Sequence, residues 1–240
     1  MFKLDKYFCF TSCASNLAEI FSNSAADKPS LSVIEATIKG HRPDTLLIAI
    51  PINTHSPVRQ KNSIVVEQDS GSKFEAISLA MALSFASELH STSPPPITVH
   101  FLFLGSEYED DSSSSGLGSR LFLQEFQTHG PVAMVYFDLN DVPANIIPHA
   151  GADSIESPPW LVRRVTEALN QSSIPAKLRR ANISYPVRLK LPWEPLLVPY
   201  HRAGIPALRI AGEYDNPDKV DQDLRLTNMR NFFDQLLARS

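Results

Sequence analysis

The side chains of this chain that could carry out chemistry are carboxylates and imidazoles close to the ends of apolar, strand-like segments. His55, Glu107 and Asp138 each follow such a segment closely, and His201 lies in a loop before the last one. Parallel α/β sheets bind ligands outside the carboxyl ends of their strands, so we expect these residues near one edge of a sheet. Carboxylates and imidazoles bind zinc, and zinc-bound water is a nucleophile in hydrolysis. Metal-assisted hydrolysis is therefore the first chemistry that these residue types indicate.

The elements that must position these residues alternate between strand and helix. The run 97–104 is almost continuously apolar, which is typical of a central strand buried on both faces. Segment 72–89 predicts a helix, because Ser72 and Glu75 form a capping box and apolar residues follow at helical spacing. The pattern predicts an α/β fold, a three-layer sandwich with a mainly parallel, twisted central sheet and helices on both faces. The other predicted strands are 31–38, 45–52, 132–137 and 206–211, and the other helices are 117–126, 158–169 and 224–237.

Length and composition favour one domain over residues 1–240. Of the 240 residues, 43% are hydrophobic, which is enough for one sizeable core. The net charge of −4 and the lack of a Lys/Arg-rich run disfavour nucleic acid as a partner. No stretch approaches the ~18 consecutive apolar residues of a membrane-spanning helix, so no transmembrane segment is expected within the chain. Residues 1–30 are expected to be helical or extended, and residues 1–10 are too short and too charged for a signal peptide.

Other catalytic schemes have weaker support. The chain has no G-x-S-x-G motif, and Gly116-Leu117-Gly118-Ser119 is too short for a dinucleotide or phosphate-binding loop. Cys9 and Cys13 form a C-x3-C pair without a second pair or a nearby His. We therefore expect two cysteines that bind no metal, either reduced or joined in a disulfide.

Six short segments, in the right order, resemble the zinc aminopeptidase and glutaminyl cyclase family. In the most specific match, the strand ending at Leu104 is followed by Glu107 and then by Gly116-Leu117-Gly118-Ser119, as in the family's F-x-F-x-x-x-E-E-x-G-L-x-G-S. An acidic, Ser-rich insertion at 109–115 separates the two halves of this motif. The resemblance covers residues 32–237 and implies a zinc-exopeptidase fold of the phosphorylase/hydrolase-like type. The other matching segments are 32–40, 45–54, 135–139, 198–207 and 214–221.

The resemblance also implies which positions should bind the metal, and most of them carry no zinc ligand here. Pro51 and Asn53 stand where the family's H-x-D-S has its His and Asp. Tyr108 replaces the second Glu of the E-E pair, and Leu197 replaces the family's ligand near A-G-I-P-A. Proline and leucine offer no metal-binding atom, and an amide is a poor zinc ligand. Glu107 matches the family's general base, which acts on zinc-bound water.

Two ligand positions keep a carboxylate. Asp138 matches the Asp of the family's x-N-L-D-M. The bridging Asp corresponds to Glu67 if Ser70-Gly71 is aligned with the family's S-G, and to Asp69 after a small shift. Because catalytic zinc usually needs three protein ligands, no metal is expected. Each carboxylate also has an ordinary explanation: Asp138 would cap a loop backbone, and Glu67 and Asp69 would favour the start of the following helix.

A displaced zinc site is the alternative. Its ligands would come from residues a few positions away from the family's, and zinc would be a cofactor only in this case. Coordination distances hold within about 0.2 Å, which disfavours ligands displaced along loops. The histidines would otherwise be exposed loop residues, and Glu107 either a vestigial cleft residue or a surface carboxylate. The displaced set comprises His55, Asp69, Glu107 or Glu109, Asp138 and His201.

The sequence therefore favours a non-catalytic, aminopeptidase-like domain that acts in binding or assembly. In lacking most ligands it is similar to nicastrin and nicalin, and this analogy rests on the fold alone. Such a domain would bind a protein or peptide partner and, by the same analogy, would be extracytoplasmic or membrane-associated. The alternative is a divergent zinc-dependent aminopeptidase, or a related amide hydrolase, with displaced metal ligands.

Overall fold

A computed structural model gives the structure of the protein. The N-terminal segment 1–30, with Cys9 and Cys13, lies outside the described residues. The structure describes residues 33–52, 57–60, 63–66, 76–92, 94–105, 107, 116–127, 130–139, 142–152, 155–180, 196–213 and 222–238.

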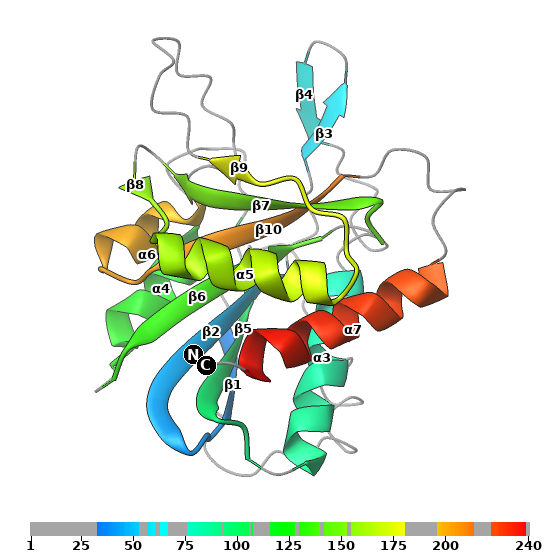
Figure 1. Ribbon diagram of the computed structural model, residues 1–240. Coiled ribbons are helices and arrows are strands. Elements are labelled where there is room, and N and C mark those ends of the chain that lie inside the picture. The colour runs from blue at the N-terminus through cyan, green and yellow to red at the C-terminus, as the bar shows by residue number, and fades with distance from the viewer. Residues whose placement is uncertain are drawn as a thin grey trace, which may run out of the picture.

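The centre of the fold is a twisted, eight-stranded sheet, with a separate hairpin beside it (Figure 1). The hairpin pairs β3 (Pro57–Gln60) with β4 (Ser63–Val66). In the large sheet β7 pairs on one edge with β10 and on the other with both β8 and β9. The order across the sheet is β1 (Val33–Ile38), β5 (Ile97–Leu104), β2 (Arg42–Pro51), β6 (Val132–Asp138), β10 (Ala207–Glu213), β7 (Asn145–Ala152) and β8 (Ile155–Glu156), with β9 (Arg179–Arg180) beside β7.

The four central strands β5, β2, β6 and β10 are parallel, as the sequence predicts. Their carboxyl ends consequently lie at one edge of the sheet. The outer strand β1 runs antiparallel to β5, and β7 runs antiparallel to β10 and β8 but parallel to β9. Across the centre, Tyr136 of β6 is in register with Ala49 of β2 on one side and with Arg209 of β10 on the other. This register determines which side chains meet at the carboxyl ends of the strands.

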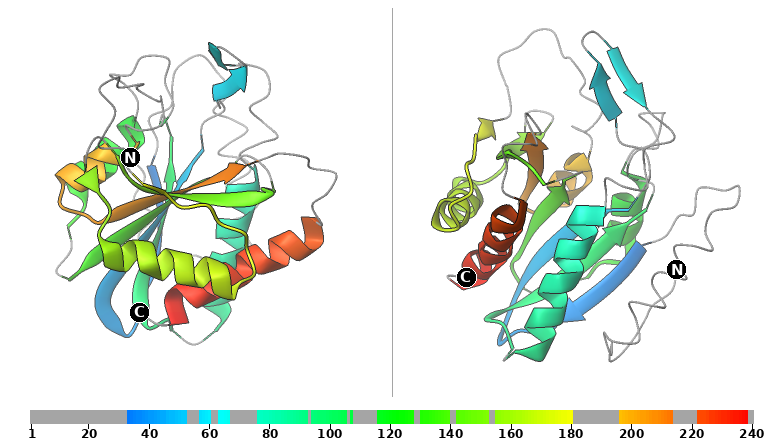
Figure 2. Two further views of the ribbon diagram at one scale, coloured as in Figure 1. Left: turned by 45° about the horizontal axis from the view of Figure 1, so that its top comes forward. Right: turned by 90° about the vertical axis from the view of Figure 1, so that its right-hand side faces the viewer.

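One face of the sheet is covered by three helices, α3 (Ala76–Ser91), α5 (Pro159–Gln171) and α7 (Gln222–Ala238) (Figures 1 and 2). Alternate residues of the strands point into this layer, because successive strand side chains face opposite sides. Phe233 of α7 stacks on Phe85 of α3 at 4.5 Å and on Phe137 of β6 at 4.9 Å, measured between ring centroids. These aromatic contacts join helices and sheet into the larger of two cores.

The other face is covered by α4 (Leu117–Glu125) and α6 (Val198–Arg202) over a smaller core. The predicted three-layer sandwich is thus present. Gly118 lets α4 approach the end of β5 closely: a Cβ atom on it would lie 2.3 Å from the carbonyl oxygen of Gly105. The second glycine of the G-L-x-G-S motif is therefore required for this helix to lie against this strand.

The observed elements differ from the predicted ones in a few places. Helix α3 is described from Ala76, so Ser72 and Glu75, the predicted capping box, lie outside the described residues. Strand β7 was not predicted, because Pro148 and Gly151 interrupt its pattern. None of the helices in the described part of the chain is both long and apolar enough to cross a membrane.

Candidate functional site

The candidate site lies at the carboxyl ends of β2, β5 and β6, on the face covered by α4 and α6. Pro51 ends β2 and is in register with Leu104, the last residue of β5. Asp138 ends β6, and Glu107 follows β5 closely. The backbone N–H of Gly116 donates to the carbonyl oxygen of Glu107 at 2.9 Å, which joins the two halves of the motif across residues 108–115. Parallel pairing therefore brings together the strand ends that the sequence identifies.

Glu107 is a fully buried carboxylate held by several donors. Its Oε1 accepts from the backbone N–H of Ser119 at 2.7 Å. Its Oε2 accepts from the Ser119 hydroxyl at 2.8 Å and from the Tyr136 hydroxyl at 2.9 Å. Tyr200 of α6 donates in turn to Ser119 Oγ at 3.0 Å. The exposed fraction of Glu107 is 0%, so this network joins β5, α4, β6 and α6 away from solvent.

Burial dominates the electrostatics of this network. It raises the pKa of Glu107 above the ordinary value of 4.5, and the hydrogen bonds from Ser119 and Tyr136 and the charge of Arg120 oppose the rise only in part. Burial, with the nearby Glu107 charge, also raises the pKa of Tyr200. A carboxylate enclosed in this way is suited to holding elements together.

Asp138 makes a buried ion pair with Arg209. The guanidinium of Arg209 in β10 donates to Asp138 Oδ2, and both side chains are only 9% exposed. The backbone of Leu139, next to Asp138, is held by Ser78: Ser78 Oγ donates to the carbonyl oxygen of Leu139 at 3.0 Å and accepts from its N–H at 3.1 Å. The sequence analysis did not foresee the ion pair of Asp138 with Arg209, and its expectation that Asp138 caps a loop backbone stays a prediction, because residues 140–141 lie outside the described residues.

The remaining described positions at this edge are apolar. Pro51 is buried, and Leu196 and Leu197 are 0% and 2% exposed in the smaller core. Zinc does not fit the residues that the structure describes here. Pro51 and Leu197 have no donor atom, and the Asp138 carboxylate already faces a cation. Among the described residues, no three His, Cys, Asp or Glu side chains gather closely enough to hold a metal ion.

His201 lies on α6 and is half-buried. Its Nε2 atom is buried and has no hydrogen-bond partner among the described residues, and burial lowers the pKa of its imidazole. His201 thus differs from the exposed loop histidine that the sequence suggests. The other candidates, His55, Asn53, Glu67, Asp69, Tyr108 and Glu109, lie outside the described residues.

Sequence reasoning missed the partners of the predicted residues. Arg209 stands in a predicted apolar strand, and a charged residue there is a signal that it has a buried partner. Ser119 was noted only as part of a motif. Tyr136 and Tyr200, distant from each other in sequence, meet Glu107 and Ser119 only through the sheet register and the placement of α6.

Comparison with solved structures places this fold among zinc exopeptidases and glutaminyl cyclases. Porphyromonas gingivalis glutaminyl cyclase is 16% identical, with a TM-score of 0.60 over 95% of this chain and 89% of that one. A glutaminyl cyclase of an Acidobacteriales bacterium is 14% identical, with a TM-score of 0.58 over 87% and 73%. BSAP, a zinc aminopeptidase from Bacillus subtilis, is 13% identical, with a TM-score of 0.57 over 85% and 48%. At these identities the likeness concerns the fold.

Comparison with protein families gives a more specific result. No curated protein matches the chain significantly. A family model for the first domain of the TP_0564 family matches residues 39–228, which is most of the chain. The chain therefore belongs to the TP_0564 family, in the region that forms the first domain of that family.

Proposed function

We propose that this chain is a non-catalytic, aminopeptidase-like domain that binds a protein or peptide partner and works without zinc. The observation that carries the proposal is the buried pair of Asp138 and Arg209. By resemblance, Asp138 occupies a metal-ligand position. Here its negative charge is balanced by a guanidinium of the same chain.

This ion pair opposes metal binding in two ways. A guanidinium is charged at all physiological pH values, so Arg209 cannot make way for a metal by losing a proton. A divalent cation beside Asp138 would be repelled by Arg209, and the repulsion is strong where water is excluded. Loading the site with zinc would require Arg209 to leave a buried position.

Glu107 supports the same conclusion. A general base must reach a water molecule next to the substrate, and a carboxylate needs a metal-activated water to attack an amide at neutral pH. Both oxygens of Glu107 accept hydrogen bonds from Ser119 or Tyr136, and the side chain is fully buried. Glu107 therefore serves as a buried hydrogen-bond acceptor that links α4 and β6 to the end of β5.

The biological role follows only by analogy. Nicastrin and nicalin are non-catalytic relatives that serve as ectodomains of membrane complexes, and a domain with this fold and no metal suits a similar task. The location of the chain would then be extracytoplasmic or associated with a membrane. This part of the proposal rests on the fold.

Hydrolysis assays test the proposal directly. The wild type, supplied with zinc, should not hydrolyse aminoacyl-nitroanilide or aminoacyl-coumarin substrates above background. Glu107→Gln, purified in the same way, should give the same residual rate, because Glu107 has no activated water beside it. Glu107→Gln should likewise leave binding of any identified partner unchanged.

The opposite result would favour the displaced-ligand enzyme. Turnover by the wild type that falls about 100-fold or more in Glu107→Gln is the size expected for loss of a general base. His55 and His201 would then be the next residues to replace. A residual rate shared by both proteins would instead indicate a contaminating peptidase.

A further inference from the structure

A row of basic side chains crosses the end of the sheet beside the Asp138–Arg209 pair. His149 of β7 is in register with Arg209 of β10 on one side and with Arg179 of β9 on the other. Directly paired residues of neighbouring strands face the same side of a sheet. Arg209 is in turn paired with Tyr136, which lies in the smaller core. Arg179, His149 and Arg209 therefore form one row on the face that holds Glu107 and Asp138.

This part of the face is partly accessible, whereas its reverse side is buried. On the α5 side of β7, Ile146, Pro148 and Ala150 are buried. On the opposite side, Ile147 and His149 are only half-buried. Ile147 is in register with Ala211 of β10, which is half-buried too, so a small apolar strip lies next to the basic row.

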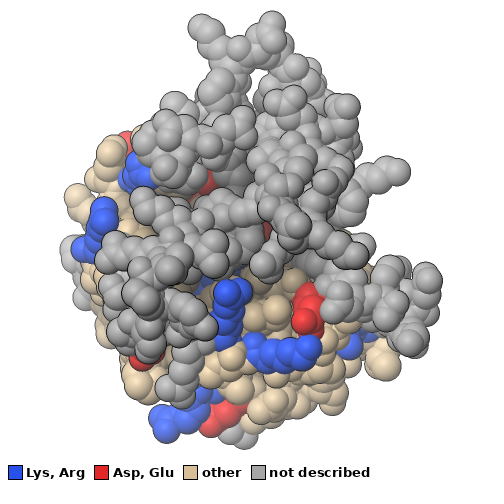
Figure 3. Space-filling model, turned by 90° about the horizontal axis from the view of Figure 1, so that it is seen from above, with Lys and Arg blue, Asp and Glu red and all other residues tan. Residues whose placement is uncertain are grey.

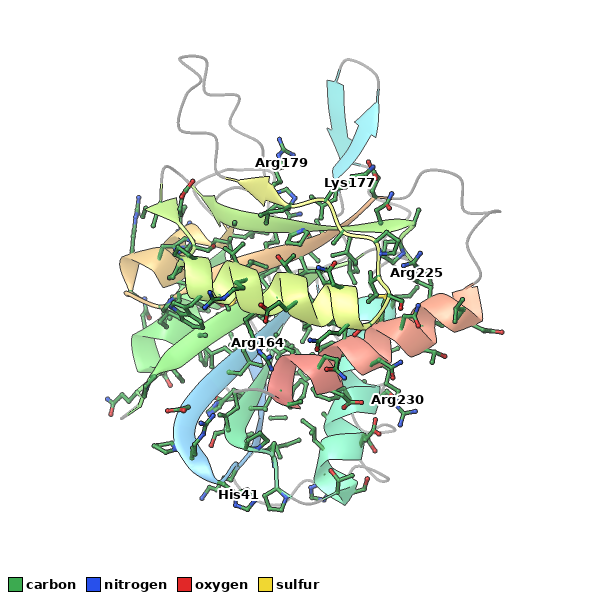
Figure 4. The ribbon with its side chains drawn as sticks, viewed as in Figure 1. His41, Arg164, Lys177, Arg179, Arg225 and Arg230 are labelled. Carbon is green, nitrogen blue, oxygen red and sulfur yellow. The ribbon has the colours of Figure 1, made fainter. Side chains whose placement is uncertain are left out.

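Positive charge exceeds negative charge along this row among the described residues. Arg209 is balanced by Asp138, whereas Arg179 is exposed at the end of the row. Figure 4 shows Arg179 and Lys177 on the upper side of the molecule, above β7, and Figure 3 shows exposed Lys and Arg side chains on that side. Lys177 pairs with Glu213, which also accepts from Asn145. The exposed Glu156 of β8 lies opposite Gly151, beyond the row.

His149, in the middle of the row, has a lowered pKa. Burial, then the charge of Arg209, then that of Arg179 lower the pKa of His149 to about 3. His149 is therefore neutral at physiological pH and holds one N–H that can donate to an acceptor. A negative charge placed beside it would offset the two guanidiniums and raise its pKa.

We propose that Arg179 and His149 form a binding site for a side-chain carboxylate of an acidic peptide. Arg179 would take the carboxylate in its planar guanidinium fork, a geometry that favours two parallel hydrogen bonds, and His149 would donate a further one. The apolar stem of the ligand would lie on Ile147 and Ala211. The inference rests on the proposed function, since it names the partner chemistry of a binding face at the same strand ends.

The test uses the whole chain and the imidazole signals of His149, identified by their loss in His149→Asn. N-acetyl-L-glutamate, used as its α-methyl ester so that only the side-chain carboxylate is charged, is titrated by NMR. The methyl ester of N-acetyl-L-glutamine is the neutral match, and inorganic phosphate is an anion without an apolar stem. N-acetyl-L-glutamate should shift the His149 signals saturably and raise the pH at which His149 titrates. The amide should do neither, and phosphate should bind more weakly.

Charge-matched variants separate this site from general attraction of anions. Arg179→Gln should weaken N-acetyl-L-glutamate binding about tenfold or more, since one charge-assisted pair is lost. Arg163→Gln removes another exposed charge, from α5, which packs on the opposite face, and should leave binding unchanged. Arg179→Lys should retain part of the affinity.

Three results would overturn the inference: no saturable shift, an equal response to the amide or to phosphate, or equal weakening by both glutamine variants. Zinc content and peptide turnover are measured on the same preparation. A chain without zinc and without turnover that also ignores N-acetyl-L-glutamate would refute the carboxylate site alone. Zinc-dependent turnover would refute the proposed function instead.

Discussion

Replacing Arg209 with methionine should lower the free energy of unfolding by about 3–5 kcal/mol, the usual effect of removing one partner from a buried ion pair. Arg209→Met leaves the Asp138 carboxylate in a site that is 9% exposed, without the guanidinium that balances it. Asp138→Asn should be destabilising for the same reason, because the charge of Arg209 then lacks its partner. Urea denaturation at neutral pH measures both effects.

Two further variants show whether the loss comes from the pair itself. The double variant Asp138→Asn/Arg209→Met should cost less than the sum of the single changes, because the remaining partner no longer carries an unbalanced charge. Lys177→Met breaks the exposed Lys177–Glu213 pair and should hardly move the denaturation midpoint, since exposed pairs contribute little. If Arg209→Met were as mild as Lys177→Met, the pair would not hold the structure together.

Replacing Glu107 with alanine should lower the free energy of unfolding about as much as Arg209→Met does. Replacing Glu107 with glutamine should be tolerated. Glu107→Ala removes the acceptor of three hydrogen bonds in a fully buried place, and a lost partner costs about 1–3 kcal/mol for each buried polar group. We therefore expect a loss of about 3 kcal/mol or more, from these bonds and the cavity together. Glu107→Gln keeps an oxygen for the Ser119 N–H and buries no charge, so it should stay within about 1 kcal/mol of wild type.

We also expect the stability difference between wild type and Glu107→Gln to depend on pH. Burial raises the pKa of Glu107 above the ordinary value of 4.5, so the folded protein binds this proton more tightly than the unfolded chain does. Proton binding by Glu107 therefore stabilises the fold fully below pH 4.5, and this stabilisation is lost as the pH rises through the folded-state pKa. The stability of wild type relative to Glu107→Gln should fall over that range and then stay level. Glutamine as damaging as alanine at neutral pH would mean that the fold needs the ionised carboxylate.

The fold could be predicted because its signals are local. The apolar run that forms β5 matches Ile97–Leu104 as predicted, and the G-L-x-G-S motif lies where a helix must approach a strand. Strand β7 was not predicted because Pro148 and Gly151 interrupt the alternation of polar and apolar residues. Its pairing with β10 nevertheless stabilises the strand, because tertiary context outweighs local propensity.

The site was less predictable because the contacts of its residues depend on pairing between distant parts of the chain. A carboxylate that follows a strand is equally compatible with a metal ligand, a general base or a buried hydrogen-bond acceptor that links elements. Only the register of β6 and β10 brings Arg209 to Asp138, and only the packing of α4 and α6 encloses Glu107. Burial, and then the charges of Arg209 and Arg179 from distant parts of the sequence, lower the pKa of His149. Spacing along the chain does not encode such neighbours.

The central claim, that the chain works without zinc, is tested most directly by elemental analysis of the protein after incubation with zinc and desalting. Thermal melts with zinc and with a chelator accompany it. We expect well under one equivalent of zinc and no change in melting temperature, because Pro51 and Leu197 carry no donor and Asp138 is paired with Arg209. A stoichiometric zinc ion that a chelator removes, and that raises the melting temperature, would contradict the account.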